Sequence, residues 1–567
     1  MTSQVKDLSP RIINFRLTQI IYLTGIITTY AISPWSNYDP ISLPKMFTLA
    51  AGAFTLLGFL LGYRKQLQGK YQKALTTASV LFFFFMITSL FMSGHKILPQ
   101  IWGTFGRNTG LLTYTSLLIL LIATHLLRDF KLYERILFVF IFGATPMTVY
   151  GLIQLSGNDP IGWSEKAVFG TLGNINFLSA YFGMTSVAAI AIATSKAYRS
   201  SIRMFIVLLA ITNIALATST NSIQGPIIFI TGLAAIIFFY VTQLRRRRII
   251  SLAIYVITFT SAVAALINAL FNKGPLASVI FQPSVIFRGD YMHAGWKMML
   301  EHPLFGVGLD NYGDWYRELR GEISTLRTGP GRISNTAHNI FLDVGSNGGV
   351  FLGLAYLVIT FLSAFAIIGF IRRGTITNPV ILSSSATWIA YQIQSLVSIN
   401  QIGVGVWGWI FSGILIGLKQ TEISISSTSQ SKAKISNFKD LKGKTVPASI
   451  TLYAFAGGAL GVILAFPPLY ADSVYRTAAN SGQFESIYSA TKMIGSTEFH
   501  SELLLEYSMK RNLESEIRLV ADDLLKDYPR NFFAWRLLSV ATTGTEEERQ
   551  SALERARELD PFNPELR

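Results

Sequence analysis

The sequence contains no cysteine, and it has few charged residues for its length. Without a thiol, the chain forms no disulfide, has no cysteine nucleophile and offers no sulfur ligand to a metal. Only 14% of the 567 residues are charged, whereas a soluble domain carries about 25%. Half of the residues are hydrophobic, and the mean hydropathy is +0.41. These figures exclude an ordinary soluble protein and indicate that much of the chain lies in lipid.

Long apolar segments recur through the first 470 residues. A bilayer core about 30 Å thick needs about 20 apolar residues per helix. Lipid offers no hydrogen-bond partners to the backbone, so segments of this length are expected to be helical. No small-residue cleavage site follows the first apolar run, so we interpret it as a membrane helix and not as a removed signal peptide. The sequence therefore predicts an all-α polytopic membrane protein of about 13 transmembrane helices, at residues 17–34, 45–63, 75–92, 109–127, 134–155, 174–195, 203–218, 223–244, 249–271, 345–371, 379–398, 403–418 and 449–470.

Lysine and arginine are distributed unevenly between alternate loops. With the N-terminus in the cytoplasm, most of them fall in the inner segments, and the short outer loops hold only Lys45, Lys96, Arg107 and Lys166. Basic residues collect on the cytoplasmic side of membrane proteins. The net charge of +16 is therefore explained by topology, and we predict no nucleic-acid partner.

Three polar segments stand apart from the apolar runs. Within a transmembrane domain at 1–470, residues 272–344 are predicted to form a long extracytoplasmic loop and residues 419–448 a flexible cytoplasmic linker. Residues 471–567 are predicted to form an extracytoplasmic helical tail. Residues 551–564 resemble the end of a tetratricopeptide repeat, and residues 478–485 resemble a turn between repeat helices. A repeat domain, which suggests a protein partner, and an ordinary helical bundle both remain open.

The long loop carries the residues that suggest chemistry. A polar loop of this length between membrane helices is uncommon unless it is functional. His338 precedes an apolar helix, so its imidazole is expected near the membrane surface, where it suits general-base work at neutral pH. The alternative is a helix-start residue that is hydrogen-bonded to the backbone. Arg288 has the planar donor fork that matches phosphate oxygens, and the alternatives for it are a lipid headgroup or Asp290 as a partner.

Acidic residues of the loop give a weaker signal. Asp310, Asp314 and Glu318 are spaced four apart, which places them on one face of a helix. Such a stripe either binds a cation or faces solvent, and we favour the solvated face. The segment Gly306-Val307-Gly308 lacks the strand and helix that flank a nucleotide-binding loop. We assign neither a metal nor a cofactor.

Several motifs around this loop occur together in one known family. The sequence EHPLFGVGLDNY (301–312), followed by AHNIFL (337–342) and GGVFLG (348–353), resembles the core of the O-antigen ligase/polymerase family. Upstream, GTLGNINFLSAY (170–181) resembles the family's Gly-Asn-Pro-Asn segment, with Ile175 at the usual proline, and GTFGRNTGL (103–111) is also similar. The resemblance covers residues 100–420, and the order of the motifs is more specific than any one of them.

The resemblance implies an activity. It implies an inverting, metal-independent transfer of a glycan from undecaprenyl pyrophosphate to an acceptor hydroxyl, in the inner membrane of a bacterium. Arg288 matches the arginine that neutralises the departing pyrophosphate, and His338 matches the histidine that activates or orients the acceptor. Fixed positive charge at a leaving group is electrostatic catalysis.

One position departs from the family pattern. Members often carry an arginine in a Ser-Arg-Gly context where this chain has Gln224. Part of the phosphate-binding role is then expected to come from Arg107 or Lys166. The substrate-binding residues predicted beside the catalytic pair are Arg107, Lys166, Gln224, Tyr291, His293 and Asn339.

Alternatives to this activity remain open. The acceptor is a lipid, a growing polymer or a protein, so a polysaccharide polymerase and a protein O-oligosaccharyltransferase are alternatives within the same family. A transporter or flippase of lipid-linked saccharides is the alternative from another class. Transporters usually show internal repeats and ionisable residues at mid-membrane. The polar residues here gather in the outer loops instead, which favours surface chemistry.

Overall fold

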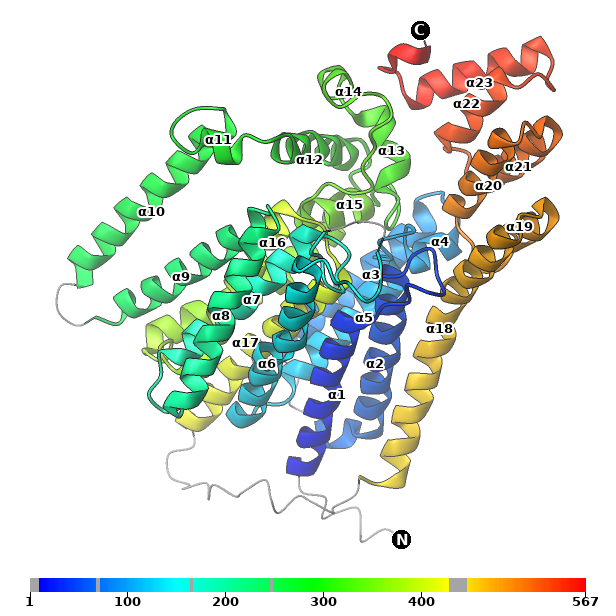
Figure 1. The fold of residues 1–567 in the computed structure, drawn as a ribbon. Helices are drawn as coiled ribbons and strands as arrows, with labels where there is room; N and C mark the ends of the chain where they lie inside the picture. Colours follow the sequence, from blue (N-terminus) through cyan, green and yellow to red (C-terminus); the bar gives the residue numbers. More distant parts are fainter. Residues whose placement is uncertain (1–9, 68–71, 164–166, 245–247, 428–445, 567) are drawn as a thin grey trace.

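The computed structural model describes residues 10–67, 72–163, 167–244, 248–427 and 446–566 (Figure 1). These residues form helices and connecting turns, and no β-strand occurs among them. The apolar segments form the main helices, which are α1 (Pro10–Tyr30), α2 (Ser42–Gly62), α3 (Lys73–Met92), α5 (Leu111–His125), α6 (Phe130–Leu155), α7 (Ile175–Ala193), α8 (Ser200–Ser219), α9 (Gln224–Thr242), α10 (Arg248–Leu270), α15 (Ile340–Arg373), α16 (Pro379–Val397), α17 (Ile402–Ser427) and α18 (Ala448–Ser481).

Each predicted apolar segment coincides with one of these helices. In the described part of the chain, ten helices are long and apolar enough to cross a membrane. Helices α1, α5 and α16 are not among the ten. Helix α5 has only 15 residues, and α16 carries a run of hydroxyl side chains at Ser383, Ser384 and Ser385. The all-helical, multi-pass architecture is confirmed, whereas the count of 13 stays a prediction.

Shorter helices make up the polar segments. Between α3 and α5 lie the short helix α4 (Ile97–Trp102) and the irregular passage 103–110. The long loop folds into α11 (Ala277–Ile280), α12 (Pro283–Glu301), α13 (Tyr312–Leu319) and α14 (Glu322–Thr328). The tail forms α19 (Phe484–Thr491), α20 (Glu498–Lys510), α21 (Glu514–Asp527), α22 (Phe532–Val540) and α23 (Glu546–Leu559), and two 3-10 turns lie at η2 (Arg64–Leu67) and η4 (Pro564–Leu566).

The long loop and the tail lie together at one end of the bundle, which we call the loop end (Figure 1). Helix α1 begins at the opposite end. The loop and the tail thus share one end of the bundle, whereas their placement outside the cytoplasm stays a prediction. Helix α17 extends to Ser427, into the segment predicted as a linker, and residues 428–445 lie outside the described residues.

Helix α18 joins the bundle to the tail without a break. It is 34 residues long, and its N-terminal half packs tightly along α2. An added Cβ at Gly58 would lie 2.0 Å from the Tyr453 carbonyl oxygen, and one at Gly461 would lie 2.5 Å from the Ala50 carbonyl oxygen. Only glycine allows the two backbones this approach. Gly482 ends α18 in the left-handed conformation, so a turn lies where the sequence predicts one, but a repeat fold of the tail stays a prediction.

Helix α15 is kinked where the loop returns to the bundle. Gly349 has φ +82° inside the helix, and a Cβ there would lie 2.3 Å from the Leu304 carbonyl oxygen. The passage after α12 fills the kink, because Val307 N–H donates to the Ser346 carbonyl at 2.9 Å. This docking fixes the start of α15, and with it the residues just before Ile340.

Candidate active site

His338 lies at the point where the loop enters α15. Its backbone is left-handed, with φ +51°, and its N–H donates to the Thr336 hydroxyl at 3.2 Å. Asn339, the next residue, caps the helix by accepting from the Leu342 N–H at 3.1 Å. Among the described residues, the imidazole itself has no hydrogen bond, so the backbone-bonded alternative for this side chain is not what the structure has.

Tyr291 on α12 supports the imidazole. The two rings are stacked, with centroids 5.1 Å apart and an interplanar angle of 29°. Tyr312 donates its hydroxyl to the Tyr291 carbonyl at 2.6 Å, and Tyr316 packs edge-on against the Tyr291 ring at 5.6 Å. Two tyrosines of α13 therefore hold α12 at a fixed distance from His338.

Arg288 lies one turn before Tyr291 on α12 and is partly buried. Its guanidinium makes no hydrogen bond or ion pair with any described residue; Asp290, the partner considered from the sequence, pairs with Arg327 at 3.2 Å instead. Burial lowers the pKa of Arg288. A guanidinium remains charged at any physiological pH, so this one is an unneutralised cation available to an anion.

The imidazole and two guanidinium groups interact electrostatically. Burial, and then the charges of Arg288 and Arg107, lower the pKa of His338 to about 3. The structure therefore brings Arg288 and His338 into one electrostatic environment. At neutral pH the imidazole carries no charge, and one of its nitrogens is free to accept a proton.

Arg107 is a buried cross-link between segments. It donates to the Asn335 carbonyl at 3.0 Å and to the Asp343 carboxylate at 3.2 Å, and it lies 3.8 Å from Asp310. Asp343 also accepts from the Thr336 hydroxyl at 2.7 Å. The guanidinium and its two carboxylates thus hold the passage that ends at His338 in place. The role of Arg107 in the structure is therefore to support the site.

The other predicted substrate-binding residues are dispersed. His293 is exposed on α12, near the Asp290–Arg327 pair and away from the Tyr291 stack. Gln224 begins α9; it is 3% exposed, and neither atom of its amide has a hydrogen-bond partner among the described residues. Lys166 lies outside the described residues. Roles in substrate binding for all of these stay predictions.

Asp343 and Arg332 are site residues that the sequence analysis did not single out. Asp343 is a carboxylate at the start of a long apolar helix, which is a signal of function or pairing. Arg332 lies over the Phe287 ring at 4.8 Å and lowers the pKa of Tyr291, although burial raises that pKa overall. No local pattern marks Arg332, because its role depends on α12 lying beside it.

The acidic stripe of the loop is not one surface. Asp310 lies before α13 and pairs with Arg107, whereas Glu318 on α13 pairs with Arg530 of the tail. No group of His, Asp or Glu side chains in the described residues is arranged to hold a metal ion. The solvated-face interpretation is also wrong for Asp310, which is buried.

Residues 205–357 match a family model described as O-antigen ligase. The matched segment runs from α8 into α15 and contains Gln224, Arg288, Tyr291 and His338, whereas Arg107 and the tail lie outside it. No curated protein matches the sequence. The ten apolar helices and this match together indicate a multi-pass membrane protein in which residues 205–357 are similar to that family.

Proposed function

We propose that this protein transfers a glycan from undecaprenyl pyrophosphate to an acceptor hydroxyl at the loop end of the bundle. The observation that carries the proposal is an unneutralised guanidinium, Arg288, whose charge acts on the uncharged imidazole of His338, while that imidazole is stacked on Tyr291, one turn from Arg288 on α12. Both residues lie within the segment that matches the O-antigen ligase family. A departing pyrophosphate is stabilised by a positive charge such as that of Arg288, and a hydroxyl nucleophile is activated by a proton acceptor such as His338.

The reaction is a single displacement. The acceptor oxygen forms a bond to the anomeric carbon as the bond from that carbon to the pyrophosphate oxygen breaks. The bonding electrons leave with the pyrophosphate, whose added negative charge is stabilised by Arg288. The proton of the acceptor hydroxyl passes to His338. Attack from the face opposite the leaving group inverts the anomeric centre, and no step requires a metal ion.

The donor itself prepares the base. Burial, and then the charges of Arg288 and Arg107, lower the pKa of His338 to about 3, which makes the imidazole a weak base. A pyrophosphate beside Arg288 offsets this positive charge and therefore raises the pKa of His338. The imidazole becomes a better proton acceptor only when the donor is bound, which couples donor binding to acceptor activation.

The framework assigns different roles to the remaining polar residues. Arg107 is already paired with Asp343 and Asp310, so its part in the reaction is to hold the passage 335–338 in place. Gln224 has a free amide and is the better candidate for a direct contact with the donor. We place the loop end outside the cytoplasmic membrane, where the carrier presents its glycan to acceptors in the cell envelope.

The test is transfer by the purified protein in lipid nanodiscs that contain an undecaprenyl-pyrophosphate-linked glycan and a candidate acceptor. We expect a new glycosidic product that forms equally in EDTA, and its loss in Arg288→Ala and in His338→Ala. The exposed Arg327→Ala is the matched control and should retain activity. Full activity in both variants would contradict the assignment of Arg288 and His338 to the active site. Movement of the donor across vesicle membranes without a new bond would show a transporter instead.

A further inference from the structure

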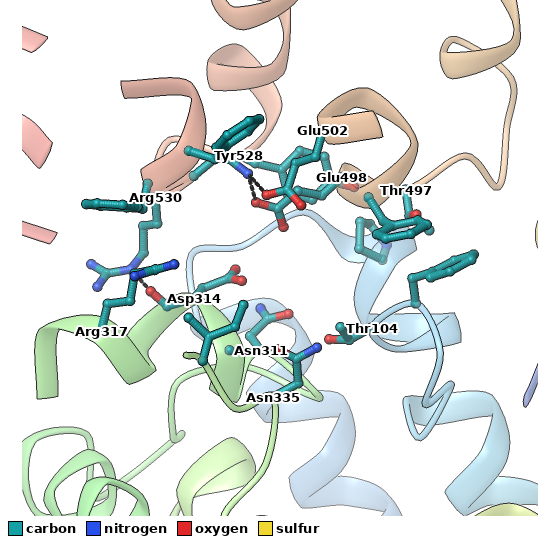
Figure 2. Close-up of a pocket in the computed structure, with 18 of the residues that line it drawn as sticks. Thr104, Asn311, Asp314, Arg317, Asn335, Thr497, Glu498, Glu502, Tyr528 and Arg530 are labelled. Atoms are coloured by element: carbon teal, nitrogen blue, oxygen red, sulfur yellow. Dashed lines mark hydrogen bonds between the residues drawn. The ribbon is translucent and has the colours of Figure 1, made fainter. Parts of the chain in front are cut away.

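A cavity of about 360 Å³ lies between the long loop and the tail (Figure 2). Its floor comes from the passage 103–105, α13 and the segment before α15, and its roof comes from α20, the turn before α22 and α22 itself. The volume is within the range of about 300–1,000 Å³ that is typical of small-molecule sites. None of its walls includes Arg288, Tyr291 or His338.

Helix α13 separates this cavity from the proposed active site. Tyr312 and Tyr316 face the Tyr291 ring on one side of the helix, whereas Asp314 and Arg317 line the cavity on the other. Asn335 connects the cavity with the proposed active site. It lines the cavity, and its carbonyl accepts a hydrogen bond from Arg107, which holds the passage before His338. A ligand in the cavity would thus lie one helix away from the reacting groups.

The lining combines flat apolar rings with amide and carboxyl groups. Phe105 of the bundle and Phe499 of the tail are stacked, with centroids 4.3 Å apart and 12° between the planes. Amide side chains come from Asn311 and Asn335 (Figure 2), and from Asn531 at the start of α22. Sugar rings have apolar faces and a rim of hydroxyl groups, so a lining of this kind is complementary to a saccharide.

Three carboxyl groups give the cavity its charge. Asp314 faces Glu498 and Glu502 across the space (Figure 2), and Asn531 donates to both glutamates, to Glu502 at 2.7 Å. Burial raises the pKa of all three, and that of Asp314 to about 7. Asp314 is therefore partly protonated at neutral pH and can donate as well as accept hydrogen bonds.

The two guanidinium groups that line the cavity are already paired, and Arg530 also donates to the Asp314 carbonyl at 3.3 Å. Arg317 binds Asp560 at 3.1 Å, and Arg530 pairs with Glu318 while it lies 3.5 Å from the centroid of the Trp315 ring. His95, 4.0 Å from Asp314, is uncharged because burial lowers its pKa to about 4. The cavity therefore disfavours an anion and accepts a neutral or positively charged ligand.

We propose that the cavity between α13 and α20 binds a saccharide unit that lacks acidic groups. Its most favourable ligand carries a free amine, since an ammonium group would neutralise the facing carboxylates. The volume of about 360 Å³ accommodates a ligand much larger than an ion. Its use as the subsite for a sugar of the acceptor rests on the proposed function, whereas the binding itself does not.

The test is calorimetric titration of the full-length protein in nanodiscs with three disaccharides of one size. They are N,N′-diacetylchitobiose, its fully deacetylated diamine, and a hyaluronan disaccharide that carries a carboxylate. We expect the diamine to bind most tightly, the acetylated form more weakly and the acidic one not measurably. Glu502→Gln should weaken the diamine about tenfold, the effect of losing one charge-assisted hydrogen bond, because the new amide still accepts from Asn531 but carries no charge.

Glu506→Gln is the matched control. Glu506 lies one turn further along α20, is exposed and pairs only with Lys510, at 4.0 Å, so this variant should bind as the wild type does. The proposal is overturned if no disaccharide binds, if the acidic one binds best, if a trilysine peptide binds more tightly than the diamine, or if the two variants are equivalent. Arg288→Ala separates the two proposals, because it should abolish transfer and leave saccharide binding unchanged.

Discussion

Asp560, seven residues from the end of the sequence, forms a buried ion pair with Arg320 of the long loop. One guanidinium nitrogen of Arg320 lies 2.8 Å and 2.7 Å from the two carboxylate oxygens, and neither side chain is exposed to solvent. The same guanidinium donates to the carbonyls of Pro330 and Arg332, at 3.2 Å and 3.0 Å. The tail thereby holds the loop segment from which Arg332 reaches Tyr291.

Substitution of Asp560 by asparagine should loosen this segment. Removing one partner of a buried ion pair leaves an uncompensated charge and costs about 3–5 kcal/mol. We expect faster amide hydrogen exchange at 329–332, and a fall in glycan transfer, because the Tyr291 support of His338 is less well held. The measurement is hydrogen exchange by mass spectrometry together with the transfer assay.

Glu565→Gln is the control for this prediction. Glu565 pairs with Arg536 in the same terminal region, but both side chains are nearly half exposed, so the variant should cost less than about 1 kcal/mol. Unchanged exchange at 329–332 in Asp560→Asn would mean that the tail does not hold the loop.

Arg288→Lys tests whether charge alone is sufficient at the proposed donor site. Lysine keeps the positive charge but lacks the planar fork that binds two phosphate oxygens at once. We expect a loss in kcat that is smaller than the roughly 10²–10³-fold loss of the alanine variant. The paired comparison is Arg327→Lys, which should transfer at the wild-type rate because Arg327 is exposed and its guanidinium is already paired with Asp290. An equal loss in the two lysine variants would point to a general effect on α12 and the loop.

The sequence was sufficient to place the helices because hydropathy is a property of each segment on its own. Every predicted apolar segment coincides with a helix in the structure. The observed helix ends differ from the predicted ones where something other than local hydrophobicity ends the helix. Helix α18 continues past its apolar run to Gly482, since the tail supports the extra turns. The early start of α15 at Ile340 is set by the Asn339 cap and by the loop docked at the Gly349 kink.

The candidate site was predictable only in part. Motif resemblance selected Arg288 and His338, which lie 50 positions apart, but no pattern indicates that Tyr291 supports the imidazole. Likewise, the sequence suggested Arg107 as a free cation, because its partners Asp310 and Asp343 are distant in the chain. Pairings across the fold depend on how the segments pack, and a single sequence does not contain that information in local form.

The contact between tail and loop should weaken as the pH rises. Because burial raises the pKa of Asp314 from its usual value near 4 to about 7, the folded state favours the protonated carboxyl. This stabilisation is complete below pH 4 and is lost as the pH rises through 7. Asp314→Asn keeps the side chain neutral, so its apparent unfolding temperature should fall less than that of the wild type between pH 5.5 and pH 8.

Two features make this measurement interpretable. Both proteins are scanned at one heating rate, since membrane proteins often unfold irreversibly and the midpoint then depends on the rate. Asp522→Asn is the control, because Asp522 is exposed on α21 beside Arg518 and should show the wild-type dependence on pH. Glu498 and Glu502 shift in the same direction as Asp314, so the variant should reduce the dependence without removing it.

Gln224→Leu separates a binding role from a structural one. The amide is buried with no hydrogen-bond partner, and an unsatisfied buried polar group costs about 1–3 kcal/mol. Replacement by a similar apolar side chain should therefore leave the unfolding temperature unchanged or raise it. If the amide contacts the donor, the same variant should raise the KM for the lipid-linked glycan.

Gln100→Leu provides the contrast, because Gln100 is buried with its hydrogen bonds satisfied, among them one from the Leu309 N–H at 2.9 Å, and its loss should lower stability. A Gln224→Leu protein that is more stable and equally active would show that the donor is bound without this residue, and the charge missing from its position would then have to be supplied by Arg288 alone.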